Sequence, residues 1–218
     1  MDWKILASLN IDDQRRLLAS AHRRRFRRGD IIFYEGDPAE ALHLLAVGHV
    51  TVSITIPNGE SAIVSILGPG AVFGELALVS RNETRAATIR ALEHSESLSL
   101  SRSQFEMLRE ASPTIDQFLI EVLATRLRTV DSYLMEALFI PAHKRVLRRL
   151  LAVGRLYQSS STGVIRVPIS QDILASMAGT SRPTANQVLR AAITDGIIQV
   201  RRSMITILQP DELAKRAI

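Results

Sequence analysis

The sequence predicts an α+β protein with a small N-terminal β-barrel, one long helix and a compact, mainly helical C-terminal domain. Three observations lead to this fold class. Short β-branched stretches separated by Gly, Pro, Asn and Asp occupy residues 26–100, a helical apolar period occupies residues 113–138, and the excess positive charge lies in the last third. With 218 residues, the chain is long enough for two domains that each bury a core.

The sequence contains no cysteine, which excludes disulfides, iron–sulfur clusters, thiolate metal sites and cysteine nucleophiles. It also lacks a G-x-S-x-G elbow, a Walker loop and a metal-spaced His/Asp cluster, so we expect no catalytic residue, no metal and no enzyme. The first residues are amphipathic, and no apolar run approaches the roughly 20 residues of a membrane span. We therefore expect a cytoplasmic protein without a membrane partner.

Residues 2–25 are predicted to form short helices, because apolar residues recur at helical spacing before a basic run that we assign to a solvated face. The apolar residues are Ile5, Leu6, Leu9, Leu17 and Leu18, and the basic run is Arg23–Arg25. From Phe26 to Leu100 we expect closely spaced short strands with glycines at or near the turns, as in a small barrel or sandwich. His43, His49 and His94 show no ligand-like arrangement and are expected at turns or on the surface.

A long helix is predicted from Pro113 to about Leu138, after a short helix over 103–110. Six apolar residues of the long helix are spaced 4, 4, 3, 4 and 4, close to the 3.5-residue period of a coiled-coil seam. They are Leu119, Leu123, Leu127, Val130, Leu134 and Leu138. This stripe favours a parallel homodimer, and the alternative is that it packs on the barrel of its own chain. Pro141 cannot continue the helix and marks a boundary or hinge.

The residues from Pro141 onward contain 12 Lys/Arg and 4 Asp/Glu, a net charge of +8, whereas residues 1–140 contain 15 and 18, a net charge of −3. A basic surface on one small domain is typical of proteins that bind the phosphate backbone of nucleic acids; the alternative is a basic face that only aids solubility.

In this basic region we expect a helix over 142–156, short strands, two helices joined by a tight turn, and a final hairpin. Ser170 and Ser181 stand where the N-caps of the two helices would lie, and Gly179 stands where a left-handed residue would end the first helix. A helix, a glycine turn and a second helix form a helix-turn-helix.

The segment from Phe73 to Val79 is followed, about ten residues after its glutamate, by Arg85-Ala86-Ala87-Thr88, and together they carry residue types suited to a ribose phosphate. Gly74 lets the backbone approach a ligand, and the turn that begins there can direct amides at an anion. Glu75 can accept a hydrogen bond from a ribose hydroxyl, and the planar guanidinium of Arg85 matches phosphate oxygens. The alternative is a structural ion pair in a domain that binds no nucleotide.

These two motifs, Gly74-Glu75-Leu76-Ala77-Leu78 and Arg85-Ala86-Ala87-Thr88, resemble the phosphate-binding cassette of the catabolite activator protein/FNR (CRP/FNR) superfamily of transcription regulators. The resemblance covers nearly the whole chain. It implies a jelly-roll domain in which Glu75 binds the ribose 2′-hydroxyl, Arg85 binds the cyclic phosphate, and amides near Leu76 and Ala86 complete the site. Alanine at position 86 resembles the domains that prefer cyclic AMP, and cyclic GMP is the alternative effector. The resemblance places an apolar wall beside sugar and base at Val52, Val64 and Phe73.

The chain departs from this family on the long helix. Regulators that respond to cyclic AMP usually carry Thr-Ser there to contact adenine, and the corresponding residues here are Val130 and Asp131. Valine cannot make the hydroxyl contact, whereas Asp131 can accept a hydrogen bond from an exocyclic amine, and Thr129 or Ser132 can substitute. The departure leaves open a regulator of the same superfamily that binds DNA without nucleotide control.

The segment beginning Ser181-Arg182-Pro183-Thr184 resembles the recognition helix of the same superfamily, usually S-R-x-T-V-x-R-x-L. The resemblance implies that Arg182 binds guanine O6 and N7, with Asn186 and Gln187 as further base readers. Pro183 replaces a glutamate that reads cytosine in the activator protein, so we transfer no operator sequence. The residues expected to contact phosphates or to position the domain are Ser170, Gln171, Thr180, Ser181, Thr184, Arg201 and Arg202.

We therefore predict a dimeric, sequence-specific regulator with a sensor domain over 1–112, a dimerisation helix over 113–140 and a winged helix-turn-helix over 141–218. Its partner is double-stranded DNA carrying a pseudo-palindrome with half-sites about 34 Å apart, and RNA polymerase is a further partner that the resemblance allows. A ligand at Glu75 and Arg85 would shift the dimer helix and the Pro141 hinge between arrangements that do and do not fit DNA.

Overall fold

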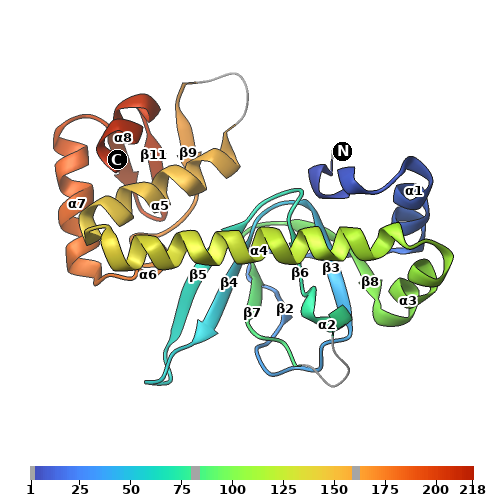
Figure 1. Cartoon of the computed structure of the whole chain (residues 1–218). Coiled ribbons are helices and arrows are strands. Elements are labelled where there is room, and N and C mark those ends of the chain that lie inside the picture. Colours follow the sequence, from blue (N-terminus) through green and yellow to red (C-terminus); the bar gives the residue numbers. More distant parts are fainter. Residues whose placement is uncertain (1–2, 80–83, 159–162) are drawn as a thin grey trace. The chain divides into compact units, whose positions relative to one another are not determined.

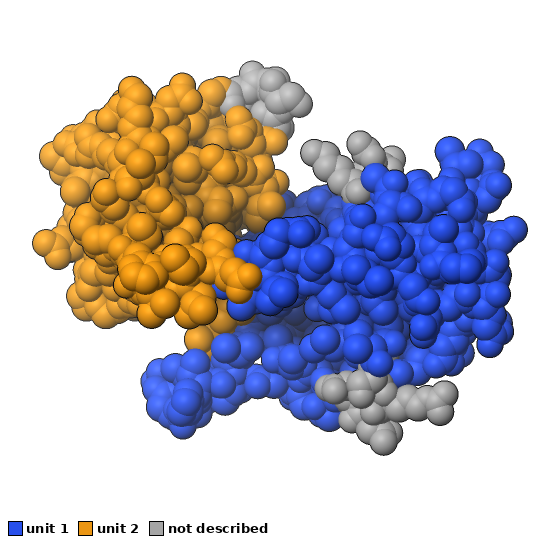
Figure 2. All heavy atoms as spheres, viewed as in Figure 1, with its two compact units in different colours: residues 1–61, 65–130 blue, residues 62–64, 131–218 orange. Residues whose placement is uncertain are grey.

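The computed structural model describes residues 3–79, 84–158 and 163–218 of the chain (Figure 1). The chain divides into two compact units, which are coloured separately in Figure 2. The first contains Met1–Ser61 and Ser65–Val130, and the second contains Ala62–Val64 and Asp131–Ile218. In the described part of the chain, no helix is both long enough and apolar enough to cross a membrane.

The first unit begins with a 3-10 turn, η1 (Lys4–Ser8), and helix α1 (Ile11–Ser20). The prediction of helix up to residue 25 is wrong from His22 onward, because strand β1 (His22–Phe26) begins there. Arginines have no strong strand preference, but β1 pairs along its whole length with β8 (Ser95–Ser101), and Glu96 accepts from Arg23 and Arg25 on the same strand face. Tertiary pairing has therefore overridden the local helical pattern.

Six further strands complete two four-stranded sheets in this unit, and the strand region predicted from Phe26 to Leu100 is confirmed. These strands are β2 (Ile31–Phe33), β3 (Ala41–Val47), β4 (Val50–Thr55), β5 (Ser61–Leu67), β6 (Val72–Phe73) and β7 (Thr88–Ala91). The strands are ordered β1-β8-β3-β6 in one sheet and β2-β7-β4-β5 in the other. The pairs β1–β8, β8–β3, β3–β6, β2–β7 and β7–β4 are antiparallel. Such a pair of antiparallel sheets is a jelly-roll arrangement, in which alternate residues of each strand face a shared core.

Three helices lie between or after these strands. Helix α2 (Leu76–Val79) is a single turn, and α3 (Arg102–Ala111) begins with a capping box in which Ser101 and Gln104 satisfy each other's backbone amides. Helix α4 (Thr114–Phe139) confirms the predicted long helix. Its first turns pack into the core of the unit through Ile115, Phe118 and Val122, so the start of the helix is fixed by apolar burial.

The apolar stripe of α4 changes its environment along the helix. Leu119 and Leu123 are half-buried, whereas the side chains after them are largely exposed in the single chain. The exposed fractions are 61% for Leu127, 52% for Val130, 55% for Leu134 and 64% for Leu138. A contiguous apolar stripe of this kind is typical of a surface that a second helix covers.

The second unit contains the predicted helix-turn-helix and, beyond the prediction, a C-terminal helix. Its elements are α5 (Ala142–Tyr157), β9 (Ile165–Val167), α6 (Gln171–Met177), α7 (Arg182–Thr194), β10 (Ile198–Arg201), β11 (Met204–Ile207) and α8 (Pro210–Ala217). The three strands form one antiparallel sheet in the order β10-β11-β9. Pro141 lies at the break between α4 and α5 and occupies the N-cap position of α5, so the long helix ends beside the proline as expected, whereas the division into compact units falls earlier, between Val130 and Asp131.

Candidate functional site

A cavity of about 370 Å³ lies within the first unit, bounded by strands, by the turn before α2 and by the middle of α4. Eight of the ten residues predicted to bind ligand line it: Val52, Phe73, Gly74, Glu75, Leu76, Arg85, Ala86 and Val130. Val64 and Asp131 are not part of the lining, and Leu67 is the residue of β5 that lines it. The volume falls in the range of about 300–1,000 Å³ that is typical of small-molecule sites.

Arg85 is the buried cation of this cavity, with only 7% of its surface exposed. Its Nη1 donates to the carbonyl oxygens of Ala41, at 2.8 Å, and Gly74, at 3.4 Å. The guanidinium carbon lies 4.0 Å from the centre of the Phe33 ring, a cation–π contact. Within the described residues, its buried Nε has no hydrogen-bond partner. The arginine is thus held in place by backbone acceptors and an aromatic ring, while its Nε is a charged donor free to bind an acceptor in the cavity.

Burial lowers the pKa of Arg85, and the carboxylates of Glu40, Asp37 and Glu75 partly offset this effect by raising it. An arginine starts from so high a pKa that it remains charged at any physiological pH. The cavity therefore combines a permanent positive charge with the carboxylate of Glu75 at its lining.

Gly74 permits the close approach between the turn and Arg85. Its φ is +76°, and a Cβ at this position would lie 2.6 Å from Nη1 of Arg85 and 2.9 Å from the carbonyl oxygen of Ala41. A side chain here would have to displace either the guanidinium or the backbone of β3. Glycine is therefore favoured at position 74 for two reasons: the backbone has a positive φ, and there is no room for a Cβ atom.

An aromatic cluster supports Arg85 from the neighbouring strands. Phe33 lies 6.0 Å from both His43 and Phe73, and the rings of His43 and Phe73 stack at 5.1 Å with an interplanar angle of 1°. His43 is buried, its Nδ1 lies 3.0 Å from Oγ of Ser97, and burial, aided by the charges of Arg85 and Arg24, lowers its pKa to about 3. It is a neutral aromatic ring at physiological pH.

The expectation that the three histidines lie at turns or on the surface is wrong for His43, which is buried within strand β3. His49 is also buried but lies in the turn between β3 and β4, and His94 is exposed, as expected. His43 occurs within an apolar stretch of β3, and the hydrophobic residues on either side of it were the signal of burial that could have corrected the expectation.

Helix α4 contributes Leu123, Arg126, Leu127 and Val130 to the lining, and the sequence analysis identified only Val130 among them as ligand-contacting. These residues are separated by three, one and three positions, so they share one helical face. The same apolar stripe that suggested a dimer seam could have indicated this face. Arg126 adds a second cation at the cavity lining.

The second unit presents the predicted DNA-contacting residues around the start of α7. Ser170 and Ser181 cap α6 and α7 by accepting from the amides of Ile173 and Thr184, and Gly179 adopts a φ of +57° after α6. The three capping predictions are confirmed. They fix the turn between the helices, which in turn presents the first residues of α7 to solvent.

Arg182, Pro183 and Gln187 are exposed on α7, as residues that read DNA must be. Nε of Arg182 lies 2.9 Å from Oδ1 of Asp172 across the turn, and both side chains are more than half exposed. Asn186 is half-buried, and its Oδ1 is shielded from solvent without a hydrogen-bond partner in the described part of the chain.

The remaining predicted contacts divide between the turn and the hairpin. Ser181 is exposed, and four others are half-buried: Ser170, Gln171, Thr180 and Thr184. Arg201 and Arg202 are exposed at the turn between β10 and β11, where Arg202 adopts a φ of +52°. The helix-turn-helix and this hairpin thus bring exposed cations from two segments of the chain into one small unit.

Comparison with protein-family models gives two matches. The Cyclic nucleotide-binding domain model matches residues 23–112, which include the cavity strands and Arg85, and the Crp-like helix-turn-helix domain model matches residues 144–216.

Among curated proteins, the chain is 35% identical over 188 residues to the Cyclic AMP receptor protein of Thermus thermophilus, covering 84% of this chain and 82% of that protein. It is 28% identical over 194 residues to the CRP-like cAMP-activated global transcriptional regulator of Mycobacterium tuberculosis, covering 88% and 86%. Two solved structures are also similar. The catabolite activator protein of T. thermophilus has 31% identity, a TM-score of 0.56 and coverage of 98% and 97%. The c-di-GMP-responsive regulator CLP of Xanthomonas campestris has 24% identity, a TM-score of 0.76 and coverage of 91% and 99%; at this identity the likeness shows the fold alone.

Proposed function

Because this chain belongs to the CRP/FNR family of DNA-binding transcription regulators and carries the family's cyclic nucleotide-binding domain, we propose that cyclic AMP bound beside Arg85 controls its affinity for DNA. The division we propose is a sensor over 1–112, a dimerisation helix over 113–140 and a DNA-binding domain over 141–218. Regulation of transcription, not catalysis, is the activity of the family and of the relatives it matches.

The buried, incompletely satisfied guanidinium of Arg85 is the observation that carries this proposal. In it, the cyclic phosphate accepts from Arg85 and from amides of the turn at Gly74–Leu76, and the carboxylate of Glu75 accepts from the ribose 2′-hydroxyl. Oxygen acceptors of a phosphate match the planar donor set of arginine, and burial strengthens that charged contact.

The base would lie against apolar side chains from two sources. Val52 and Phe73 provide the wall on the strand side, and Leu123, Leu127 and Val130 provide the wall on α4. Val130 supplies only van der Waals contact, so a hydrogen bond to adenine would have to come from Asp131, Thr129 or Ser132 of this chain or from the chain's partner in a dimer. We propose cyclic AMP ahead of cyclic GMP because Ala86 offers no hydroxyl for a guanine amino group and the curated relatives are named for cyclic AMP.

For DNA binding we propose a homodimer joined through the exposed stripe of α4. The dimer presents two copies of α7 to a pseudo-palindromic operator. Arg182 reads guanine, Gln187 reads an adjacent base, and the serine and threonine side chains at the helix starts contact phosphates. Arg201 and Arg202 contact the backbone beside the groove. RNA polymerase is the further partner of a regulator that activates transcription.

The test is calorimetric titration of the purified protein with cyclic AMP and with cyclic GMP. We expect heat with cyclic AMP, loss of binding in Arg85→Ala, and full binding in the control Arg28→Ala, which removes an exposed arginine outside the cavity lining. Loss of the guanidinium–phosphate contact should weaken affinity at least tenfold, or about 1.4 kcal/mol. Heat with neither nucleotide would defeat the proposal.

A second candidate is a regulator whose DNA affinity does not depend on cyclic AMP. One observation favours it: Val130 lines the cavity where a hydroxyl would contact adenine. Operator affinity that no cyclic mononucleotide changes would select this candidate, whereas a footprint lost in Arg182→Ala is expected in both cases.

A further inference from the structure

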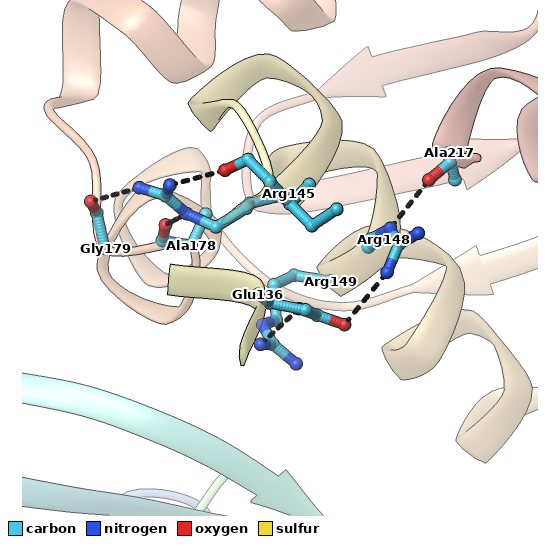
Figure 3. A network of polar contacts seen from close by, with 8 residues as sticks. Glu136, Arg145, Arg148, Arg149, Ala178, Gly179 and Ala217 are labelled. Atoms are coloured by element: carbon cyan, nitrogen blue, oxygen red, sulfur yellow. Dashed lines mark hydrogen bonds and ion pairs between the residues drawn. The ribbon is translucent and has the colours of Figure 1, made fainter. Parts of the chain in front are cut away.

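Arg145 bridges the break between α4 and α5. Arg145, in the first turn of α5, directs all three guanidinium nitrogens at backbone carbonyl oxygens (Figure 3). Nη1 donates to Ile140 at 2.8 Å, Nε to Ala178 at 2.9 Å and Nη2 to Gly179 at 3.0 Å. Arg145 therefore joins the last residue before Pro141 to the turn of the helix-turn-helix.

A second contact joins the helices themselves. Glu136, in the last turns of α4, accepts from Nη2 of Arg149 at 2.6 Å and from Nη1 of Arg148 at 3.4 Å (Figure 3). The side chain of Arg149 is 7% exposed and that of Glu136 is 15% exposed. The guanidinium of Arg149 also lies 3.7 Å from the ring centre of Tyr133, one turn earlier on α4. Arg148 continues the link, because its Nε donates to the carbonyl oxygen of Ala217 at 2.7 Å.

These contacts oppose bending at residues 140–141. A change of the angle between α4 and α5 would pull Arg149 from Glu136 and from Tyr133, which would leave a buried charge without its partner. It would also separate Ile140 from the guanidinium of Arg145, which is already anchored on Ala178 and Gly179. A proline removes one backbone hydrogen bond, but here side chains replace the lost restraint.

We infer that residues 133–158 and 163–218 form one rigid body, in which Arg145, Arg149 and Glu136 are positioning residues for the recognition helix α7. On this inference the bend that couples effector to DNA occurs in α4 before Tyr133, and not at the Pro141 hinge that the sequence predicts. This inference rests on the DNA-binding function of the family and not on which nucleotide the sensor binds.

The first test measures distances between paired spin labels, and the absence of native cysteine makes the labelling specific. Ala137→Cys and Gln199→Cys, both exposed, place labels on α4 and β10 within the proposed body; Glu110→Cys with Gln199→Cys is the reference pair that joins the two units. Labelled chains are mixed with an excess of unlabelled chain so that each dimer carries one labelled protomer. We expect a narrow distance distribution for the first pair that cyclic AMP does not shift, and a broader one after Arg145→Ala.

The second test measures operator affinity at saturating cyclic AMP in Arg145→Ala, Arg145→Lys and Glu136→Gln. We expect each to bind operator at least about fivefold more weakly, the lower end of ordinary coupling effects, while the dissociation constant for cyclic AMP stays within twofold. Lysine retains the positive charge but cannot donate all three hydrogen bonds that the planar guanidinium makes. Arg145→Lys therefore tests the positioning role if Arg145→Ala does not fold. Arg155→Ala, which removes an exposed arginine of the same helix, is the matched control and should bind operator normally.

The inference is overturned if cyclic AMP shifts the first label pair, or if the Arg145 and Glu136 variants leave both the distance distribution and the operator affinity unchanged. A shift in neither label pair on adding cyclic AMP counts against nucleotide control, and the rigid body is then judged by the broadening that Arg145→Ala produces. The two failures are therefore distinguishable.

Discussion

Replacing Gly74 by alanine tests whether the cavity depends on the close contact between the turn and Arg85. Gly74 has a φ of +76°, and the new Cβ would lie 2.6 Å from Nη1 of Arg85 and 2.9 Å from the carbonyl oxygen of Ala41. The guanidinium can move only by giving up its bond to Ala41, whereas the carbonyl belongs to the backbone of β3 and cannot yield cheaply. Gly74→Ala should therefore displace Arg85 from the position in which it meets a phosphate.

The unfolding free energy that Gly74→Ala loses has a conformational part and a steric part. A non-glycine residue in the left-handed region costs about 1–2 kcal/mol, and this part also applies to Gly70→Ala, where φ is +90° and no atom lies within 4 Å of the added Cβ. Gly70 is thus the matched control: it has the same strain without the clash and lies outside the cavity lining. Gly70→Ala should therefore lose about 1–2 kcal/mol of unfolding free energy. Gly74→Ala should lose this amount and, because of the clash, a further steric contribution.

The assay combines urea unfolding, followed by circular dichroism, with calorimetric titration of cyclic AMP. With a slope of about 2 kcal/mol per molar urea, the control should lower the unfolding midpoint by about 0.5–1 M and leave nucleotide affinity unchanged. Gly74→Ala should weaken nucleotide binding at least tenfold, equivalent to about 1.4 kcal/mol. If Gly74→Ala binds cyclic AMP as tightly as the parent protein, the contact with Arg85 does not build the site and the reasoning is refuted.

Three other predictions concern stability, assembly and DNA binding. Hydrogen bonds from Ser112 and Thr114 lower the pKa of Asp13 below its ordinary value of 3.8. The stability that this carboxylate contributes is therefore complete above pH 3.8 and is lost as the pH falls through the lowered pKa. Asp13→Asn should flatten the acid limb of a curve of unfolding free energy against pH. Leu134→Asp places a charge on the exposed stripe of α4 and should shift the sedimentation coefficient from dimer to monomer with unchanged helix content; persistence of the dimer would exclude the stripe as the seam. Asp172→Ala releases Arg182 from an exposed ion pair worth under about 1 kcal/mol, so thermal stability should hardly change while operator affinity rises a few fold, and weaker binding would argue that the pair positions Arg182 for DNA.

Much of the local structure follows from sequence because its causes lie within a few residues. Ser170 and Ser181 cap helices through amides three residues away, and Gly179 ends α6 because a left-handed residue is needed immediately after it. The period of α4 and the glycine of the turn at Gly74 are local features of the same kind.

The predictions that were wrong concern features that depend on residues far apart in the chain. Strand β1 contains a run of arginines that looks like a solvated helix end, and only its pairing with β8, 69 to 77 positions later in the chain, makes it a strand. The burial of His43 depends on a stack with Phe73, thirty residues later, and on Ser97 in the neighbouring strand. No local period reports either contact, because both depend on how distant strands meet in the sheet.

The same distinction holds for the site. The residue types of the cassette determined that an arginine and a carboxylate stand at the spacing of a phosphate-binding turn, since that chemistry is carried by the residues themselves. Only the tertiary structure decided that Phe33 lies beneath Arg85, that Leu123 and Arg126 of α4 join the lining, and that Arg145 reaches across Pro141 to Gly179. Those arrangements depend on packing between elements far apart in the chain, where burial and the need to satisfy polar groups, not local preference, select the partner.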